Sequence, residues 1–188
     1  ERYADFYHYQ WFTLQNMPQA VHQGNYLVLA DELGLADRVI IKLNKKGIRP
    51  YIAHKGDSFH INDPFNITLN PSSQADLDQL IKYLSSKGVA LTQVLYFWSQ
   101  DTPLITDQED SHTLSSNQDI ACSTYMNLIR AAARYEIKSR IWLITSESDI
   151  VVDTDLVPNL SQVALYGVGR VACNEYPYLD IRMVDLTN

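Results

Sequence analysis

Short apolar runs alternate along the chain with segments in which apolar residues recur every three or four positions. The run at residues 26–30 (YLVLA) is typical of a strand that is covered on both faces of a sheet. Similar runs and β-like alternation predict further strands at residues 48–54, 65–69, 94–98, 141–145 and 181–184. Apolar residues at helical spacing predict helices at residues 35–46, 71–87, 120–135 and 160–175, with Gly47, Gly88 and Pro177 as helix stops.

Strands that alternate with helices predict βαβ units and hence a parallel sheet, because each crossover returns the chain in the same direction. We therefore predict a single α/β domain over residues 1–188, Rossmann-like, with a mainly parallel sheet and helices on both faces. Residues 99–119 form the one long irregular segment. They are rich in Asp, Ser, Thr and Gln, and a mobile loop is predicted there.

Residues 1–18 are dense in aromatic side chains and are predicted to form an opening strand. The aromatic residues within the first twelve positions are Tyr3, Phe6, Tyr7, Tyr9, Trp11 and Phe12. Burial of each contributes about 1.5–3 kcal/mol, so the segment is expected to cover its own sheet or to pair with a second copy. The start without Met and the stop after an apolar run are interpreted as cuts from a longer polypeptide.

Composition and charge narrow the classes of function. A net charge of −7 and a pI near 5.1 argue against nucleic-acid binding, which needs a concentrated basic face. No stretch approaches the roughly 18 apolar residues of a membrane span, and no signal peptide is recognisable. The two cysteines, Cys122 and Cys173, cannot form a disulfide framework or a cysteine-rich zinc site, and they suit the reduced thiols of a cytoplasmic protein.

The first strand–helix turn is where a Rossmann domain binds the pyrophosphate of a dinucleotide. That turn needs the pattern G-x-G-x-x-G, because glycines let the backbone approach the phosphates at a helix N-terminus. Residues 30–36 read ADELGLA here, with one glycine. Asp31 and Glu32 would repel the pyrophosphate, so we predict no nucleotide site in this turn.

A second candidate for a nucleotide loop is the segment 167–172 (GVGRVA), which matches G-x-G-x-x-A. Asp185 follows at nearly the spacing of about 20 residues that is expected of a ribose ligand. However, Pro177 leaves too short a helix after the motif. We therefore interpret Gly167 and Gly169 as sites of close helix packing, with an independent dinucleotide-dependent reductase as the alternative from another class.

The other candidate residues lack the spacing or the neighbouring groups that catalysis or metal binding would require. Tyr51 and Lys55 match the Tyr-x-x-x-Lys pair of short-chain reductases, but on a predicted strand they lie about 13 Å apart. A possible metal set lies in a predicted solvated turn and comprises His54, Asp57, His60 and Asp63. Residues 146–148 follow a buried strand without a base directed at them, and we interpret them as a cap or turn. No catalytic, cofactor-binding or metal-ligating residue is predicted.

Six pieces of sequence follow one another in a recognisable order. They are an aromatic strand with Trp11, then YLVLADELGLADRVIIKLNKKG, FNITLNPSSQADLDQLIKYL, VLYFWS, IWLITSES and VALYGVGRVACNEYPYLDIRMVDL. This order resembles the structural subdomain of the ketoreductase region in modular type I polyketide synthases. In the family pattern three positions lie on strands, and Trp11, Trp98 and Trp142 match them. Its W-G-L-G-R-…-E-H-P motif is matched by Gly167, Gly169, Arg170, Glu175 and Pro177.

The chain departs from that family pattern at three places. The residues after Thr145 read SESD in place of RGA, Tyr166 replaces a tryptophan, and Tyr176 replaces a histidine. These positions are expected on turns and on a helix surface, so the predicted fold is unaffected.

The resemblance implies a truncated Rossmann-like fold that has no nucleotide site and precedes the ketoreductase catalytic subdomain of a multidomain synthase. It implies a non-catalytic scaffold that docks on that subdomain and stabilises it, and so supports NADPH-dependent reduction of a β-ketoacyl intermediate on an acyl carrier protein. NADPH is expected in the catalytic subdomain, because the family's Ser, Tyr, Lys and Asn set has no counterpart here. The alternative within the family is a pseudo-ketoreductase domain of a non-reducing module, bracing a methyltransferase or dehydratase.

Overall fold

The computed structural model describes residues 23–103, 111–149 and 158–186. The predicted opening strand at 1–18, with Trp11, lies outside them. The described strands are β1 (Asn25–Leu29), β2 (Tyr51–Lys55), β3 (His60–Ile61), β4 (Asn66–Leu69), β5 (Leu91–Tyr96), β6 (Arg140–Ser146) and β7 (Asp180–Leu186). The described helices are α1 (Leu35–Lys45), α2 (Gln74–Ser86), the 3-10 helix η1 (Trp98–Asp101), α3 (Ser111–Arg134) and α4 (Leu160–Glu175).

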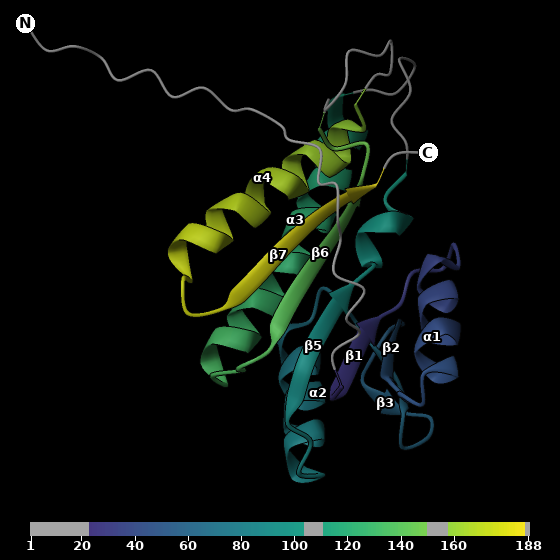
Figure 1. Ribbon diagram of the computed structural model, residues 1–188. Helices are drawn as coiled ribbons and strands as arrows, with labels where there is room; N and C mark the ends of the chain where they lie inside the picture. The colour runs from purple at the N-terminus through teal and green to yellow at the C-terminus, as the bar shows by residue number, and fades with distance from the viewer. Residues whose placement is uncertain (1–22, 104–110, 150–157, 187–188) are drawn as a thin grey trace, which may run out of the picture.

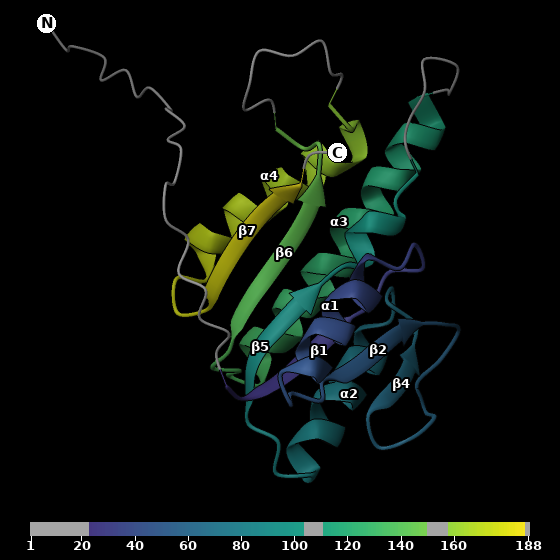
Figure 2. The same ribbon diagram turned by 45° about the vertical axis from the view of Figure 1, so that its right-hand side comes forward.

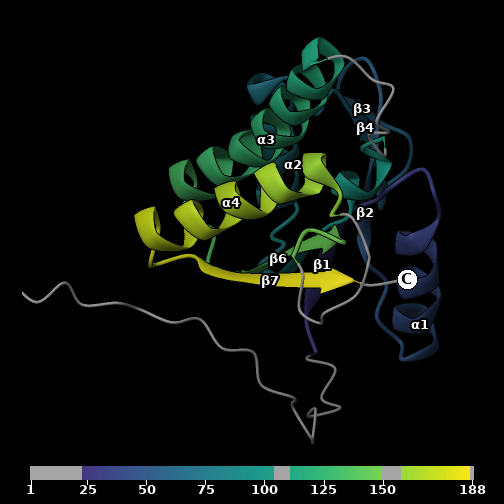
Figure 3. The ribbon, with the colours of Figure 1, turned by 90° about the horizontal axis from the view of Figure 1, so that it is seen from above.

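The strands form one sheet in the order β3-β4-β2-β1-β5-β6-β7, and Figure 2 shows this order from β4 across to β7. All neighbours pair in parallel except β3, which is antiparallel to β4. α1 covers one face, and α2, α3 and α4 cover the other (Figures 1 and 3). These features confirm the predicted α/β fold, and they match the doubly wound order in which the direction of winding reverses beside the first strand.

Each face of the sheet carries its own apolar layer. The larger layer lies under α2, α3 and α4 and contains buried residues such as Leu27, Leu143 and Tyr125. The layer under α1 contains Val28 and Ile40. β1 contributes to both layers, and this explains why its sequence is a continuous apolar run rather than an alternating one.

The predicted strand at 94–98 ends early because the chain turns at Phe97. The amide of Phe97 still donates to the carbonyl of Leu29, at 2.9 Å, but its backbone angles are helical (φ −102°, ψ −7°). Trp98 therefore opens η1, and its predicted strand position is wrong, although only 3% of the residue is exposed. Continuous apolar sequence indicates burial here and not extended backbone.

The mobile loop predicted at 99–119 is wrong at both ends. Residues 99–101 belong to η1, and residues 111–119 form the first turns of α3, which begins earlier than predicted. Most side chains in those turns are exposed, so their polar composition reflects a solvated helix surface. Residues 104–110 lie outside the described residues.

The short edge strand β3 is absent from the sequence prediction, which placed a solvated turn there. Asp63 closes the turn between β3 and β4. Its carboxylate accepts hydrogen bonds from the side chain of Asn66 at 2.7 Å and from the amide of Phe65 at 2.8 Å, and these bonds lower the pKa of Asp63. A strand of two residues carries too short a pattern for detection in the sequence.

Tyr96 and Tyr125 are neighbouring buried phenols with different polar partners. Their ring centroids lie 5.1 Å apart, edge to face. The Tyr96 hydroxyl lies 2.8 Å from the Thr124 hydroxyl, which itself donates to the carbonyl of Ala121 at 3.1 Å, so Tyr96 is the donor. Within the described residues the Tyr125 hydroxyl has no hydrogen-bond partner, and burial raises the pKa of both phenols.

Removal of the two hydroxyls is therefore expected to have unequal effects. Tyr96→Phe should lower the free energy of unfolding by about 1 kcal/mol, because a buried hydrogen bond is lost. Tyr125→Phe should leave it unchanged or raise it, because the deleted hydroxyl is buried without compensation. Urea unfolding of both variants measures the difference. Equal destabilisation would show that Tyr125 has a polar partner after all.

Candidate functional site

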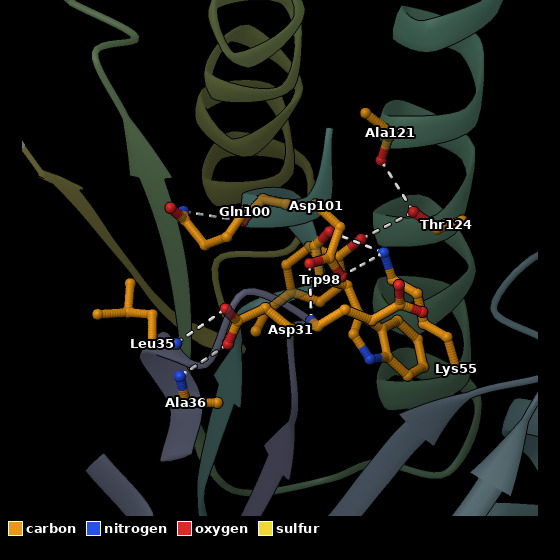
Figure 4. A network of polar contacts seen from close by, with 12 residues as sticks. Asp31, Leu35, Ala36, Lys55, Trp98, Gln100, Asp101, Ala121 and Thr124 are labelled. Atoms are coloured by element: carbon orange, nitrogen blue, oxygen red, sulfur yellow. Dashed lines mark hydrogen bonds and ion pairs between the residues drawn. The ribbon is translucent and has the colours of Figure 1, made fainter. Parts of the chain in front are cut away.

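The carboxyl edge of the sheet between β1 and β5 is where a fold of this kind would bind a ligand. Doubly wound sheets bind ligands outside the carboxyl ends of their strands, where the direction of winding reverses. Three segments meet at this edge: Asp31 directly after β1, Lys55 at the end of β2, and η1 after β5 (Figure 4).

Asp31 occupies the N-terminus of α1 with its own carboxylate. Its Oδ2 accepts a hydrogen bond from the amide of Leu35 at 2.9 Å, and its Oδ1 accepts one from the amide of Ala36 at 2.7 Å. Gly34 precedes the helix with φ +85°, a conformation that favours glycine. A Rossmann turn would offer such free helix amides to a pyrophosphate. Here a buried side chain of the chain itself supplies the anion.

Lys55 and Asp101 connect the loops around this edge. Lys55 Nζ lies 2.6 Å from Asp101 Oδ2 and donates to the carbonyl of Trp98 at 3.2 Å. Asp101 Oδ1 accepts a hydrogen bond from the amide of Glu32 at 2.7 Å. The pair is largely buried, with 25% and 10% of the two side chains exposed. The loops that would border a nucleotide crevice are therefore bonded to one another.

A cavity of about 180 Å³ lies beside this network, and its lining includes Lys55, Trp98 and Thr124. Pockets for small ligands usually measure about 300–1,000 Å³, so this cavity is small for a dinucleotide. The larger cavity, of about 440 Å³, lies at the amino-terminal edge of β5, β6 and β7, away from the point where the winding reverses. Two of its charges pair with each other, because Arg140 Nε lies 2.6 Å from Asp180 Oδ2.

The second candidate loop, residues 167–172, lies inside α4 and follows no strand directly. Asp185, its possible ribose ligand, binds the turn after β6 instead. The Asp185 carboxylate accepts from the hydroxyls of Thr145 and Ser148, both at 2.7 Å, and from the amide of Asp149 at 3.2 Å. Ser146 is the last residue of β6, so the predicted cap or turn is wrong at that position, and only residues 147–148 leave the strand. Residues 167–172 are helical and do not form a phosphate loop.

The two glycines of α4 have different surroundings. A Cβ at Gly169 would lie 2.6 Å from Leu143 Cδ2 and 2.9 Å from Met183 Cε, so α4 packs closely on β6 and β7 there. This position confirms the predicted close packing. Gly167 is exposed, and nothing described lies within 4 Å of a Cβ at that position, so no described contact accounts for glycine there.

The sequence matches, over residues 24–188, the family described as beta-ketoacyl synthase-like, N-terminal. The chain belongs to this family. This membership confirms the resemblance drawn from the sequence, to the structural subdomain of the ketoreductase region in polyketide synthases. No curated protein matches the chain.

Solved structures with this fold come from ketoreductases and from short-chain dehydrogenases. The structure of an adenylation, ketoreductase and pseudo-Asub assembly from a keto acid-selecting NRPS module is 20% identical, with TM-score 0.76, over 92% of this chain and 14% of that one. A C2-type ketoreductase from a modular polyketide synthase is 20% identical, with TM-score 0.63, over 90% of this chain and 34% of that one. A putative short-chain alcohol dehydrogenase from Burkholderia multivorans is 14% identical, with TM-score 0.63, over 88% of this chain and 83% of that one.

The remaining motif positions of this structural subdomain lie on elements of the fold. Trp142 lies in β6, where its Nε1 donates to Gln93 Oε1 at 2.7 Å. Arg170 lies within α4, Glu175 is its last residue, and Pro177 follows its end. These four positions thus lie in β6, in α4 and just after the end of α4.

The other candidate residues are not brought together as a site. Tyr51 and Lys55 lie at opposite ends of β2, and Lys55 pairs with Asp101 rather than with Tyr51. No group of three or more possible metal ligands occurs among the described residues. Both cysteines are free thiols, and burial raises their pKa. In the part of the chain that the structure describes, no helix is long and apolar enough to cross a membrane.

Sequence reasoning missed the pairing of Lys55 with Asp101. Asp101 falls within the segment that was predicted to be a mobile loop, and no spacing relates it to Lys55. The polar composition of the segment concealed η1, which holds the carboxylate in place. Only the parallel arrangement of β2, β1 and β5 brings the two side chains to one edge.

Proposed function

We propose that this chain is a non-catalytic scaffold that docks on and stabilises a ketoreductase catalytic subdomain in the same polypeptide. The single observation that carries the proposal is the Asp31 carboxylate on the N-terminus of α1. A dinucleotide would have to displace this anion before its pyrophosphate could use the same amides. NADPH then binds in the catalytic subdomain, which reduces a β-ketoacyl intermediate on an acyl carrier protein.

Two further observations support a scaffold role. The carboxyl-edge loops are joined through Lys55 and Asp101, and the segment 167–172 runs within α4. The chain spans 14% and 34% of two structures that include ketoreductases but 83% of a single short-chain dehydrogenase. A dehydrogenase-like unit that forms only a part of a ketoreductase is consistent with chemistry carried by the rest of the polypeptide.

Calorimetry with NADPH tests the proposal directly. The chain alone should show no saturable binding in the micromolar range, because the helix amides that a pyrophosphate needs are already bonded. A longer polypeptide that includes the catalytic subdomain serves as the positive control and should bind NADPH. Micromolar affinity of the chain alone for NADPH would overturn the scaffold role and favour the independent reductase.

A further inference from the structure

The outer face of α4 carries an exposed apolar stripe. Its members are Leu160, Val163, Gly167 and Val171, named here the outer α4 stripe. Their spacings of three and four residues place them on one side of the helix. Leu160, Val163 and Val171 are 44%, 38% and 58% exposed, while the opposite side of α4 packs on the sheet (Figure 1).

Gly167 lies at the centre of the outer α4 stripe without a local reason to be glycine. Glycine in the interior of a helix costs roughly 0.5–1 kcal/mol relative to alanine. Its φ is not positive, and a Cβ there would meet nothing described within 4 Å. Gly169, by contrast, is required by its contact with Leu143. A small residue between exposed valines suits the close approach of another helix, since side chains at a contact set the distance between helix axes.

We infer that the outer α4 stripe is the docking surface for one helix of the ketoreductase catalytic subdomain in the same polypeptide. This inference rests on the proposed function and adds the contact face to it. The stripe spans 11 residue steps and hence about 17 Å, or three turns, which matches the length over which two helices pack. Its four members carry no charge, so it suits an apolar helix face rather than a charged partner.

The size of solved ketoreductases supports this occupant over a second copy of the chain. This chain covers 34% of the C2-type ketoreductase, so about twice its own length of polypeptide is available there to cover the stripe. Neither α3 nor the sheet covers it, because the stripe lies on the side of α4 that is turned away from the buried residues Leu165 and Ala172.

The test uses the polypeptide that contains this chain and the catalytic subdomain. Val163→Asp places a charge in the stripe, and Gly167→Leu fills the close-approach position. Ile41→Asp is the matched control, because Ile41 is an exposed apolar residue of α1 on the other side of the sheet. The readouts are the half-life of the catalytic subdomain under limited proteolysis and its thermal unfolding, neither of which requires activity.

Both stripe variants should shorten that half-life roughly tenfold, the factor that corresponds to about 1.4 kcal/mol of docking free energy. Ile41→Asp should leave it unchanged, and neither stripe variant should lower the melting temperature of the 188-residue chain alone. An effect no larger than that of Ile41→Asp would overturn the inference. A dimer of the isolated chain that Val163→Asp dissociates would also overturn it, by identifying a second copy as the occupant.

Failure of this inference and failure of the proposed function give different results. If the chain alone binds NADPH, the scaffold role fails whatever the stripe variants do. If the chain does not bind NADPH and the stripe variants have no effect, only the docking face is wrong.

Discussion

Gly169→Val is expected to lower the free energy of unfolding by about 1–3 kcal/mol, the usual effect of overpacking a core. Even a Cβ at this position would lie 2.6 Å from Leu143 Cδ2, and Leu143 is a fully buried residue of β6. The added methyl groups must therefore displace α4 from the sheet or force Leu143 and Met183 out of their rotamers. Urea unfolding with a constant slope for wild type and variant measures the loss.

The matched control for this prediction lies two residues away in the same helix. Gly167→Ala should raise the free energy of unfolding by about 0.5–1 kcal/mol, because the new Cβ enters open space and the helix gains propensity. Gly169→Ala should have the opposite sign. If both alanine variants stabilise the chain, the close contact of α4 with Leu143 and Met183 is wrong.

Asp31→Ala is expected to destabilise the chain by about 2 kcal/mol, at the upper end of the range for helix N-caps. The variant leaves the amides of Leu35 and Ala36 without their acceptor, and Ala36 is fully buried. The favourable interaction of a carboxylate with the N-terminus of α1 is lost as well. Asp31→Asn keeps one acceptor oxygen and should lower the free energy of unfolding by less. Urea unfolding of the two variants therefore separates the contribution of the hydrogen bonds from that of the charge.

Asp31→Ala should also fail to create a nucleotide site. The Lys55–Asp101 pair and the bond from the amide of Glu32 to Asp101 still join the loops at the carboxyl edge. Calorimetry of the variant with NADPH measures this. Micromolar binding would show that Asp31 by itself closes a crevice that is otherwise intact.

The regular elements of this subdomain could be predicted because their signals are local. The run at 26–30 is apolar on both faces, since β1 is central and contributes to both apolar layers. α4 has its predicted bounds of 160–175, because Pro177 ends the helical pattern. The prediction that the turn at residues 30–36 binds no pyrophosphate was also drawn from local features, the count of glycines and the signs of two charges.

The errors arose where a local pattern has two physical causes. Trp98 ends an apolar run because it is buried, but an apolar run is also typical of a strand. Only the helical backbone at Phe97 shows that Trp98 is buried outside a strand. Polar composition at 111–119 is typical of a loop, but it also fits the exposed turns of a helix such as α3. Gly167 and Gly169 carry the same local sequence signal, although one faces outward and the other faces Leu143.

The sequence by itself determined the class of fold, the order of its elements and the single glycine and two acidic residues of the turn at residues 30–36. These properties depend on periodicity, helix stops and charge, which act over a few neighbouring residues. The tertiary structure decided what Asp31 and Asp101 do and which side of α4 is left exposed. Hydrogen bonds, ion pairs and packing act over a few ångströms of space, and the parallel sheet brings together Lys55 and Asp101, which lie far apart in the sequence.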